Sequence, residues 1–316
     1  MPRRCKIGPI GFELPTIRKR KGKETEMKKI TAILLALVMI LSLAACGTAA
    51  STTEATETEA TEAPAETEAT AEAEAAEETA QGGTLVFATS ADYAPFEFIV
   101  LDENNEQKYV GIDVSVAQAI ADDMGMELQV VNMDFDSLMA NLQKGDADIV
   151  LAAIEVTEER LEAADFSDPY YTDLPAMILV KADKAEEYTS VESFSGKSVG
   201  AQTGTTKVDI VNETLTGANL VALTSVNDLV NQLVYDKVDA IVVDGAVAMQ
   251  YAQANSDLVV ADVSLGEAAP FCVAVQKGDP KGLLTSINAT IAKLLADGSI
   301  DTFAAEADAL SDQAIA

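Results

Sequence analysis

Residues 83–316 predict an α/β fold with mostly parallel sheets, divided into two lobes. Three observations favour this class. Short apolar runs alternate with segments of helical spacing, which is typical of strand–helix units. Glycines such as Gly125 and Gly145 close the helical segments. The length, roughly 230 residues, suits two lobes of about 100 residues each.

The elements follow in order from local patterns. The run TLVFAT at 84–89 is apolar and ends in a polar turn, so it predicts a buried strand. Residues 115–124 are apolar at helical spacing and predict a helix. By the same reasoning we expect further strands at 128–131, 148–152, 176–180, 198–201, 240–243 and 271–275. We expect helices at 135–144, 227–235, 246–252 and along the C-terminal segment, and a further element at 208–212.

Composition excludes several classes of function. The chain carries 21 Lys+Arg against 52 Asp+Glu, a net charge of −31, so it repels the phosphates of nucleic acids. It contains no His, which removes the commonest general base and the commonest metal ligand. We therefore expect no metal and no cofactor. The cysteines Cys5, Cys46 and Cys272 are too few and too scattered for a disulfide framework. Cys272 lies in an apolar run, and we expect it to be buried and inert.

The N-terminal segment has the features of an export signal. Residues 27–45 begin Met-Lys-Lys, continue as a short apolar run and end in Leu-Ala-Ala, directly before Cys46. This arrangement resembles a bacterial lipobox, which implies a diacylglyceryl anchor on Cys46. An ordinary cleaved signal or an uncleaved anchor are the alternatives. Residues 1–26 are a basic extension upstream of this signal, and we expect Met27 to be the true start.

Residues 46–82 predict a disordered acidic tether that follows the lipid anchor. The stretch 47–82 consists almost entirely of Ala, Thr, Glu and Ser, with ten Glu and one Pro. It has no large apolar residue, so it cannot bury enough surface to fold, and its like charges extend it.

One arginine marks a candidate binding site. After Cys46 the chain has eleven basic residues, and Arg160 alone among them is an arginine. Lysine serves surface solubility here, so an isolated Arg indicates a position that needs the planar guanidinium. That group matches a carboxylate with two parallel hydrogen bonds. A structural ion pair is the alternative.

Six short motifs surround this arginine at a characteristic spacing. They are DYAPFEF at 92–98, GID at 111–113, GDAD at 145–148, VTEER at 156–160 followed by DFSDPY at 165–170, GTT at 204–206, and VDAIVVD at 238–244. Together they resemble the family 3 extracellular solute-binding proteins, the amino-acid receptors of ABC importers. The resemblance implies a two-lobed fold with two hinge crossovers and a ligand cleft between the lobes. The first lobe would comprise 83–170 and 270–316, and the second 174–265.

The resemblance also implies which residues hold the ligand backbone. Arg160 would grip the α-carboxylate, and Thr157 would add a hydroxyl one turn earlier. Thr205 and Thr206 precede a helix, where free backbone N–H groups favour an anion. Asp244 would receive the α-ammonium at the end of a strand. Helix capping is the alternative role for Asp244, and for Thr157 it is an alternative that could coexist with ligand binding.

Other positions would face the ligand side chain. Tyr93 and Phe135 match family positions whose rings contact it, with core packing as the alternative. Glu155 departs from the family, because it stands where a small hydroxyl residue is usual. If it points inward, Glu155 and Asp244 oppose Arg160 with a net charge of −1, which favours a cationic side chain. Ser90 weighs against this, because some basic-amino-acid binders have an acid there. A rim position or a lysine partner is the alternative for Glu155.

We therefore expect a non-enzymatic, monomeric receptor. It would capture a basic or polar amino acid by lobe closure and deliver it to an ABC permease, while a lipid anchor holds it at the outer face of the cell membrane. The alternatives are an enzyme of the cyclohexadienyl dehydratase kind on the same fold, or a surface adhesin. The dehydratase would need two carboxylate sites, and a single arginine argues against the second.

Overall fold

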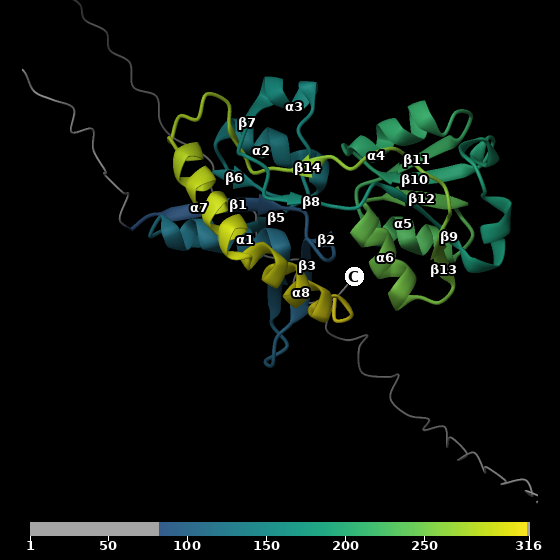
Figure 1. Ribbon diagram of the computed structural model, residues 1–316, viewed down its shortest axis with the longest axis horizontal. Coiled ribbons are helices and arrows are strands. Elements are labelled where there is room, and N and C mark those ends of the chain that lie inside the picture. Colours follow the sequence, from purple (N-terminus) through teal and green to yellow (C-terminus); the bar gives the residue numbers. More distant parts are fainter. Residues whose placement is uncertain (1–81, 315–316) are drawn as a thin grey trace, which may run out of the picture. The chain divides into compact units, whose positions relative to one another are not determined.

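Two five-stranded sheets organise residues 82–314, the part of the chain that the computed structural model describes (Figure 1). These residues belong to one compact unit, Ala73–Ala316. The expectations for the upstream extension, for the export signal with Cys46 and for the tether lie outside the described residues, apart from Gly82.

The first sheet has the order β5-β1-β6-β15-β7. Its strands are β1 (Thr84–Thr89), β5 (Glu127–Asn132), β6 (Ile149–Val150), β7 (Ala164–Phe166) and β15 (Ala274–Gln276). β1 runs parallel to β5 and β6, whereas β15 is antiparallel to β6 and β7. A late segment of the chain thus completes a sheet that the early segments begin. A three-stranded sheet adjoins it, made of β2 (Asp92–Tyr93), β3 (Glu97–Leu101) and β4 (Gln107–Val110).

The second sheet has the order β11-β10-β12-β9-β13. Its strands are β9 (Met177–Lys181), β10 (Ser198–Gln202), β11 (Asn219–Leu223), β12 (Ala240–Val243) and β13 (Leu258–Val260). β10 is parallel to β11 and β12, and β9 is antiparallel to its neighbours. The chain passes between the two sheets twice. These crossovers pair with each other through β8 (Tyr171–Thr172) and β14 (Pro270–Phe271).

Helices cover both sheets (Figure 1). Around the first sheet lie α1 (Ile112–Asp123), the 3₁₀ turn η1 (Phe135–Ser137), α2 (Leu138–Lys144), α3 (Glu158–Ala163), α7 (Leu284–Asp297) and α8 (Ser299–Ser311). Around the second lie η2 (Ala182–Glu187), η3 (Val191–Phe194), α4 (Thr206–Asp209), its π-helical continuation η4 (Ile210–Thr214), α5 (Val226–Val234) and α6 (Gly245–Ala254). The C-terminal helices α7 and α8 pack against α1 and against each other. No described helix is long and apolar enough to cross a membrane.

Gly111 fixes the start of α1. Its φ is +127°, and a Cβ added there would lie 2.1 Å from the carbonyl oxygen of Phe96. Only glycine tolerates both the left-handed backbone and this close approach. The amides of Ile112 and Asp113 then donate to the carbonyls of Pro95 and Phe96, so the helix is tied directly to the DYAPFEF segment.

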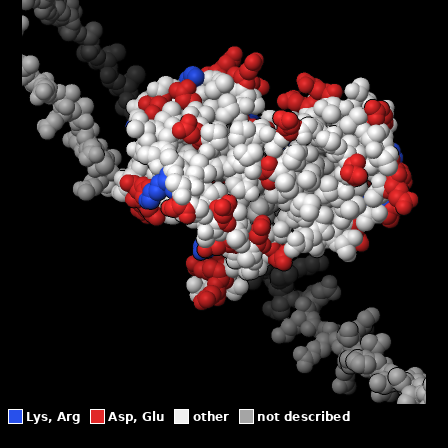
Figure 2. Space-filling model, in the orientation of Figure 1, with Lys and Arg blue, Asp and Glu red and all other residues white. Residues whose placement is uncertain are grey.

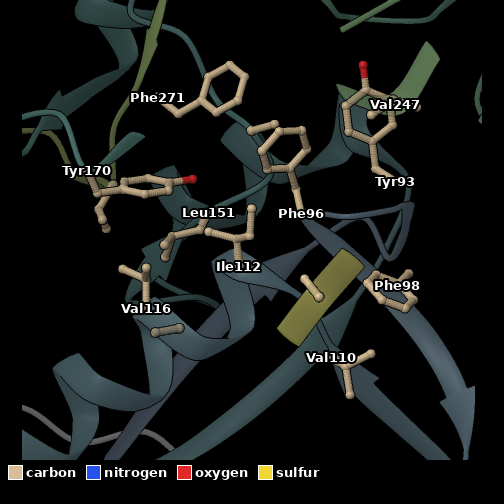
Figure 3. Packing of buried hydrophobic residues seen from close by; sticks show 14 of the residues in the cluster. Tyr93, Phe96, Phe98, Val110, Ile112, Val116, Leu151, Tyr170, Val247 and Phe271 are labelled. Atoms are coloured by element: carbon tan, nitrogen blue, oxygen red, sulfur yellow. The ribbon is translucent and has the colours of Figure 1, made fainter. Parts of the chain in front are cut away.

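Aromatic side chains join the first sheet to the crossovers. Figure 3 shows Phe96 beside Phe271, and their rings meet edge to face at 5.2 Å. Phe96 also contacts Tyr171 edge-on at 5.6 Å. In the same cluster Tyr93 lies beside Val247 of α6. One continuous apolar core thus reaches both sheets and holds Tyr93 where they meet.

Three expected elements differ from the structure. The strand expected at 148–152 is only Ile149–Val150, because Ala153 turns the chain with φ +47° and donates its amide to Asp113. The segment expected as one helix at 135–144 opens with the 3₁₀ turn.

The strand expected at 271–275 is interrupted. The amide of Cys272 donates to Ile154, and that of Val273 to Ser167, so neither continues a sheet ladder. Cys272 is therefore not inside a strand, although it is free and buried as expected. Burial raises the pKa of its thiol to about 11, which keeps it in the unreactive thiol form.

Candidate functional site

Strand ends of both sheets meet at one pocket. Segments that follow β1, β6, β10 and β12 contribute to its wall. The residues lining the pocket are Tyr93, Glu97, Phe135, Ala152, Ala153, Glu155, Arg160, Gln202, Thr205, Thr206, Lys207 and Asp244. The carboxyl ends of strands are the usual place for a ligand in open α/β sheets. The free volume of the pocket is about 10 Å³, so its walls are nearly in contact.

Arg160 spans the two halves of the pocket. It sits on α3, and the side chain of Thr157 caps this helix by accepting from the Arg160 amide at 3.1 Å. One guanidinium nitrogen donates to the carbonyl of Glu155 at 2.8 Å, and the other to that of Gly204, across the pocket, at 3.1 Å. The guanidinium carbon lies 5.4 Å from the centre of the Phe135 ring, within cation–π range. Two of five N–H donors are thus committed to backbone, which leaves donors for a carboxylate.

Asp244 is the acidic counterpart, at the end of β12. Its Oδ2 accepts from the Tyr93 hydroxyl at 2.8 Å, and its amide donates to the same hydroxyl at 2.9 Å. Its Oδ1 lies 2.6 Å from the Nζ of Lys207. Asp244 occupies the N-cap position of α6 but makes no capping bond with its side chain. The carboxylate of Asp173 accepts from the Ala246 amide instead. Capping of α6 by the Asp244 side chain, the alternative interpretation of the sequence, is therefore wrong.

Glu155 turns into the pocket and contacts the second sheet. Its Oε1 lies 3.1 Å from the Nζ of Lys207, and its Oε2 accepts from the Thr206 hydroxyl. Glu155 thus lines the pocket and is also the partner of a buried lysine, whereas a solvent-facing rim position, the other alternative, is not what the structure shows. Thr205, by contrast, uses its hydroxyl to donate to the carbonyl of Gln202.

Lys207 is one of two pocket residues that could not be identified from the sequence. It is 4% exposed and bridges the two pocket carboxylates, Glu155 and Asp244. Burial works to lower the pKa of Lys207, but the attraction of Asp244 and Glu155 outweighs it and raises the pKa, so the ammonium stays charged. The expected net charge of −1 is therefore wrong. With Arg160 included, the two cations and two anions sum to zero.

Glu97 is a second residue that was missed. It is 1% exposed, lines the pocket, and its Oε2 has no hydrogen-bond partner among the described residues. Burial raises the pKa of Glu97 well above its usual value, and the nearby charge of Asp113 raises it further. Asp113 is itself held by the Ala153 amide at 2.8 Å and the Tyr170 hydroxyl at 2.7 Å. Burial and the neighbouring carboxyl thus both favour the uncharged form of Glu97.

Two larger cavities flank the pocket. One, of about 460 Å³, is lined by Phe135, Thr157, Arg160 and Asp209, among others. Thr157 thus faces this outer cavity rather than the pocket, and its capping role is the one that the structure shows. The other, also about 460 Å³, includes Ser90 in its lining. Of the eight predicted site residues, the structure therefore brings seven together around the pocket: Tyr93, Phe135, Glu155, Arg160, Thr205, Thr206 and Asp244.

Acidic residues dominate the charged surface of the visible face. Figure 2 shows Asp and Glu side chains spread over the visible face, with few Lys or Arg between them. The described residues hold no group of three or more candidate metal ligands.

The fold and this pocket define a two-lobed solute-binding protein. Residues 85–306 match the model of the bacterial extracellular solute-binding proteins, family 3, and the chain belongs to this family. It is 35% identical over 189 residues to the arginine-binding extracellular protein ArtP of Bacillus subtilis (strain 168), covering 58% of this chain and 71% of that protein.

Two solved structures share the fold. An amino acid ABC transporter substrate-binding protein from Streptococcus pneumoniae, bound to L-arginine, has a TM-score of 0.68 at 39% identity and covers 72% of this chain and 94% of its own. An ancestral arginine-binding protein bound to glutamine has a TM-score of 0.63 at 35% identity. The match covers 70% of this chain and 96% of that protein. The architecture is thus that of an amino-acid-binding protein.

Proposed function

We propose that this protein is the extracytoplasmic receptor of an ABC importer for a basic or polar amino acid. One observation carries the proposal: Arg160 and Asp244, attached to different sheets, face the same pocket with opposite charge. This arrangement complements the zwitterion that all free α-amino acids share. Relatives bound to arginine and to glutamine support the ligand class.

The binding mechanism follows from the contacts of each sheet. The guanidinium of Arg160 accommodates the α-carboxylate, together with amides at the start of α4. Asp244 accepts the α-ammonium, and Tyr93 orients its carboxylate. Because these groups come from both sheets, a bound amino acid links them and stabilises the closed arrangement. We propose lobe boundaries of 83–170 with 270–316 and 174–265, which the strand assignments support.

We propose binding without catalysis. Both ionised pocket acids, Glu155 and Asp244, are held by Lys207, so neither is poised as a free acid or base. Incubation of the protein with prephenate tests the dehydratase alternative, since turnover would consume the substrate. Recovery of all the prephenate is the expected result.

The membrane location and the oligomeric state complete the proposal. The Leu-Ala-Ala-Cys46 sequence supports a lipid anchor on Cys46, and the acidic tether would place a monomeric receptor beside its permease. A permease gene next to this one would support the same partner.

A thermal-shift screen tests the receptor function directly. The purified protein is heated with each of the twenty amino acids and with ornithine, citrulline and cystine. A true ligand at 100 times its Kd stabilises the native state by about 2.7 kcal/mol, a readable rise in Tm. If none of them raises the Tm, the proposed function is wrong.

A further inference from the structure

The pocket contains its own ammonium group. Lys207 follows Thr206 at the start of α4, and its side chain is buried between Asp244, at the end of β12 in the same half, and Glu155 of the other half. Its Nζ lies 2.6 Å from Asp244 Oδ1 and 3.1 Å from Glu155 Oε1. These are the two carboxylates that could accept the cationic groups of a ligand. Lys207 therefore occupies acceptor positions that a basic amino acid would need.

The charges of the pocket leave no acceptor for a second ligand cation. Among the residues that line it, the cations are Arg160 and Lys207, and the ionised acids are Glu155 and Asp244. The third carboxyl of the lining, Glu97, is buried, and this burial raises its pKa well above the usual value, which favours the uncharged form. The charges of these groups sum to zero, and the zwitterionic backbone of a ligand adds no net charge. A cationic side chain would leave one buried positive charge without compensation, which is strongly unfavourable.

Other nearby acids do not fill this role. Asp173 lies close to Asp244 and Lys207, but its carboxylate accepts from the Ala246 amide and does not line the pocket. Glu159 and Asp209 line the outer cavity on the far side of Arg160. Their exposure to the wider cavity makes them weak partners for a group inside the pocket.

Resting on the proposed function, we propose that Lys207 determines side-chain specificity by holding Glu155 as an internal counter-ion, so that the pocket selects amino acids with uncharged side chains over basic ones. When a ligand binds, its α-ammonium takes the Asp244 carboxylate, and Lys207 keeps Glu155. Replacing Lys207 by a neutral residue releases Glu155, and the pocket then has the net charge of −1 that suits a basic side chain.

The test compares ligands and variants that differ only in charge. Arginine and citrulline have nearly the same shape, but the citrulline side chain is neutral. Their Kd values are measured by calorimetry for the wild type, for Lys207→Gln and for Lys293→Gln. Lys293 is exposed and pairs with Asp123 away from the pocket, so it controls for the change in net charge. The tightest neutral ligand from the thermal-shift screen is measured alongside.

The expected result is a change of preference. The wild type binds the neutral ligand more tightly than arginine, and Lys207→Gln raises the ratio of arginine affinity to neutral-ligand affinity at least tenfold. Lys293→Gln leaves this ratio unchanged. If the wild type does not bind arginine at all, Lys207→Gln gains measurable arginine binding. Adding Glu155→Gln to Lys207→Gln abolishes the gain, because the released carboxylate is gone.

Different failures have different meanings. If Lys207→Gln weakens the binding of both ligands equally, or leaves the ratio of their affinities within threefold of the wild type, Lys207 has only a structural role. The inference is then overturned, although the receptor function stands. If the wild type binds no amino acid, the proposed function fails instead. Lys207→Met provides a second neutral variant, and its melting curve shows that the fold is retained. The same change of ratio is expected for it.

Discussion

The hydroxyl of Tyr93 is bonded twice to Asp244: it donates to Oδ2 at 2.8 Å and accepts from the backbone amide at 2.9 Å. The two residues are 151 positions apart, one beside the first sheet and one at the end of a strand in the second. This pair is therefore a direct polar link between the two halves of the binding pocket, made by the residue that orients the proposed α-ammonium acceptor.

Tyr93→Phe should weaken amino-acid binding without unfolding the protein. Phenylalanine retains the ring that packs beside Val247, but the Asp244 amide and carboxylate each lose a partner in a buried place. An unsatisfied buried group costs about 1–3 kcal/mol, which corresponds to a rise in Kd of about 5- to 150-fold. Calorimetry with the ligand found by the thermal-shift screen measures this rise in Kd. A Kd equal to that of the wild type would show that the link contributes nothing to the bound state.

Arg160→Lys should nearly abolish binding. Lysine keeps the charge but cannot bond the Glu155 carbonyl, the Gly204 carbonyl and a carboxylate in one planar arrangement. Loss of a desolvated, charge-assisted pair costs about 2–5 kcal/mol. Calorimetry gives the affinity, and an unchanged circular-dichroism spectrum shows that the fold is intact. Glu158→Gln, in the same helix, serves as a neighbouring control. Binding within threefold of the wild type would contradict the role of Arg160.

Asp244→Asn should weaken the binding of every amino acid, whatever its side chain. The change removes the charge that faces the common α-ammonium and leaves Lys207 with Glu155 alone. We expect a loss of about 2–5 kcal/mol for neutral and basic ligands alike, measured by calorimetry with both. A loss confined to one ligand class would move Asp244 from backbone recognition to side-chain specificity.

The order of strands and helices is largely predictable from the sequence. The apolar runs at 84–89 and 240–243 are strands, and the segment expected as a helix at 227–235 is one at Val226–Val234, because local spacing and burial agree there. The run at 271–275 is interrupted because its amides bond Ile154 and Ser167, residues more than 100 positions away. A local pattern contains no information about such partners.

The same limit applies to the site. Arg160 and Asp244 could be predicted because composition and motif position mark them. Lys207 and Glu97 could not, since what makes them notable is burial at the place where two distant segments meet. A lysine one position after Thr206 looks like an ordinary surface residue in the sequence. Its presence inside the pocket changes the expected net charge from −1 to zero and thereby the expected ligand.

Cys46→Ser should abolish lipidation and release any processed protein from the membrane fraction. If Cys46 carries the lipid, serine cannot accept the diacylglyceryl group, and the unlipidated precursor accumulates. Labelling with radioactive palmitate, followed by separation of membrane and soluble fractions, measures both effects in cells that produce the full chain. Cys5→Ser is the matched control, because Cys5 lies upstream of the export signal and no Leu-Ala-Ala sequence precedes it. Label that persists in the Cys46→Ser variant would rule out the lipobox interpretation.

Asp173→Asn should remove part of the pH dependence of stability. Burial raises the pKa of Asp173 to about 6, and the neighbouring charge of Asp244 adds to this, against an ordinary value of 3.8. Between about pH 4 and pH 6 the unfolded chain has therefore lost this proton while the native protein keeps it. A native state that binds more protons loses stability as the pH rises, so the free energy of unfolding falls across this window and stays lower above it.

Asparagine can still accept from the Ala246 amide, so the start of α6 is preserved. We expect the variant to gain about 1–3 kcal/mol relative to the wild type between pH 4 and pH 7, with the lower end reflecting partial solvent access. Urea unfolding at a series of pH values measures the difference. Asp228→Asn removes the same charge from an exposed position and controls for the altered net charge. A difference between Asp173→Asn and wild type that stays constant from pH 4 to pH 7 would show that Asp173 does not hold its proton in the folded protein.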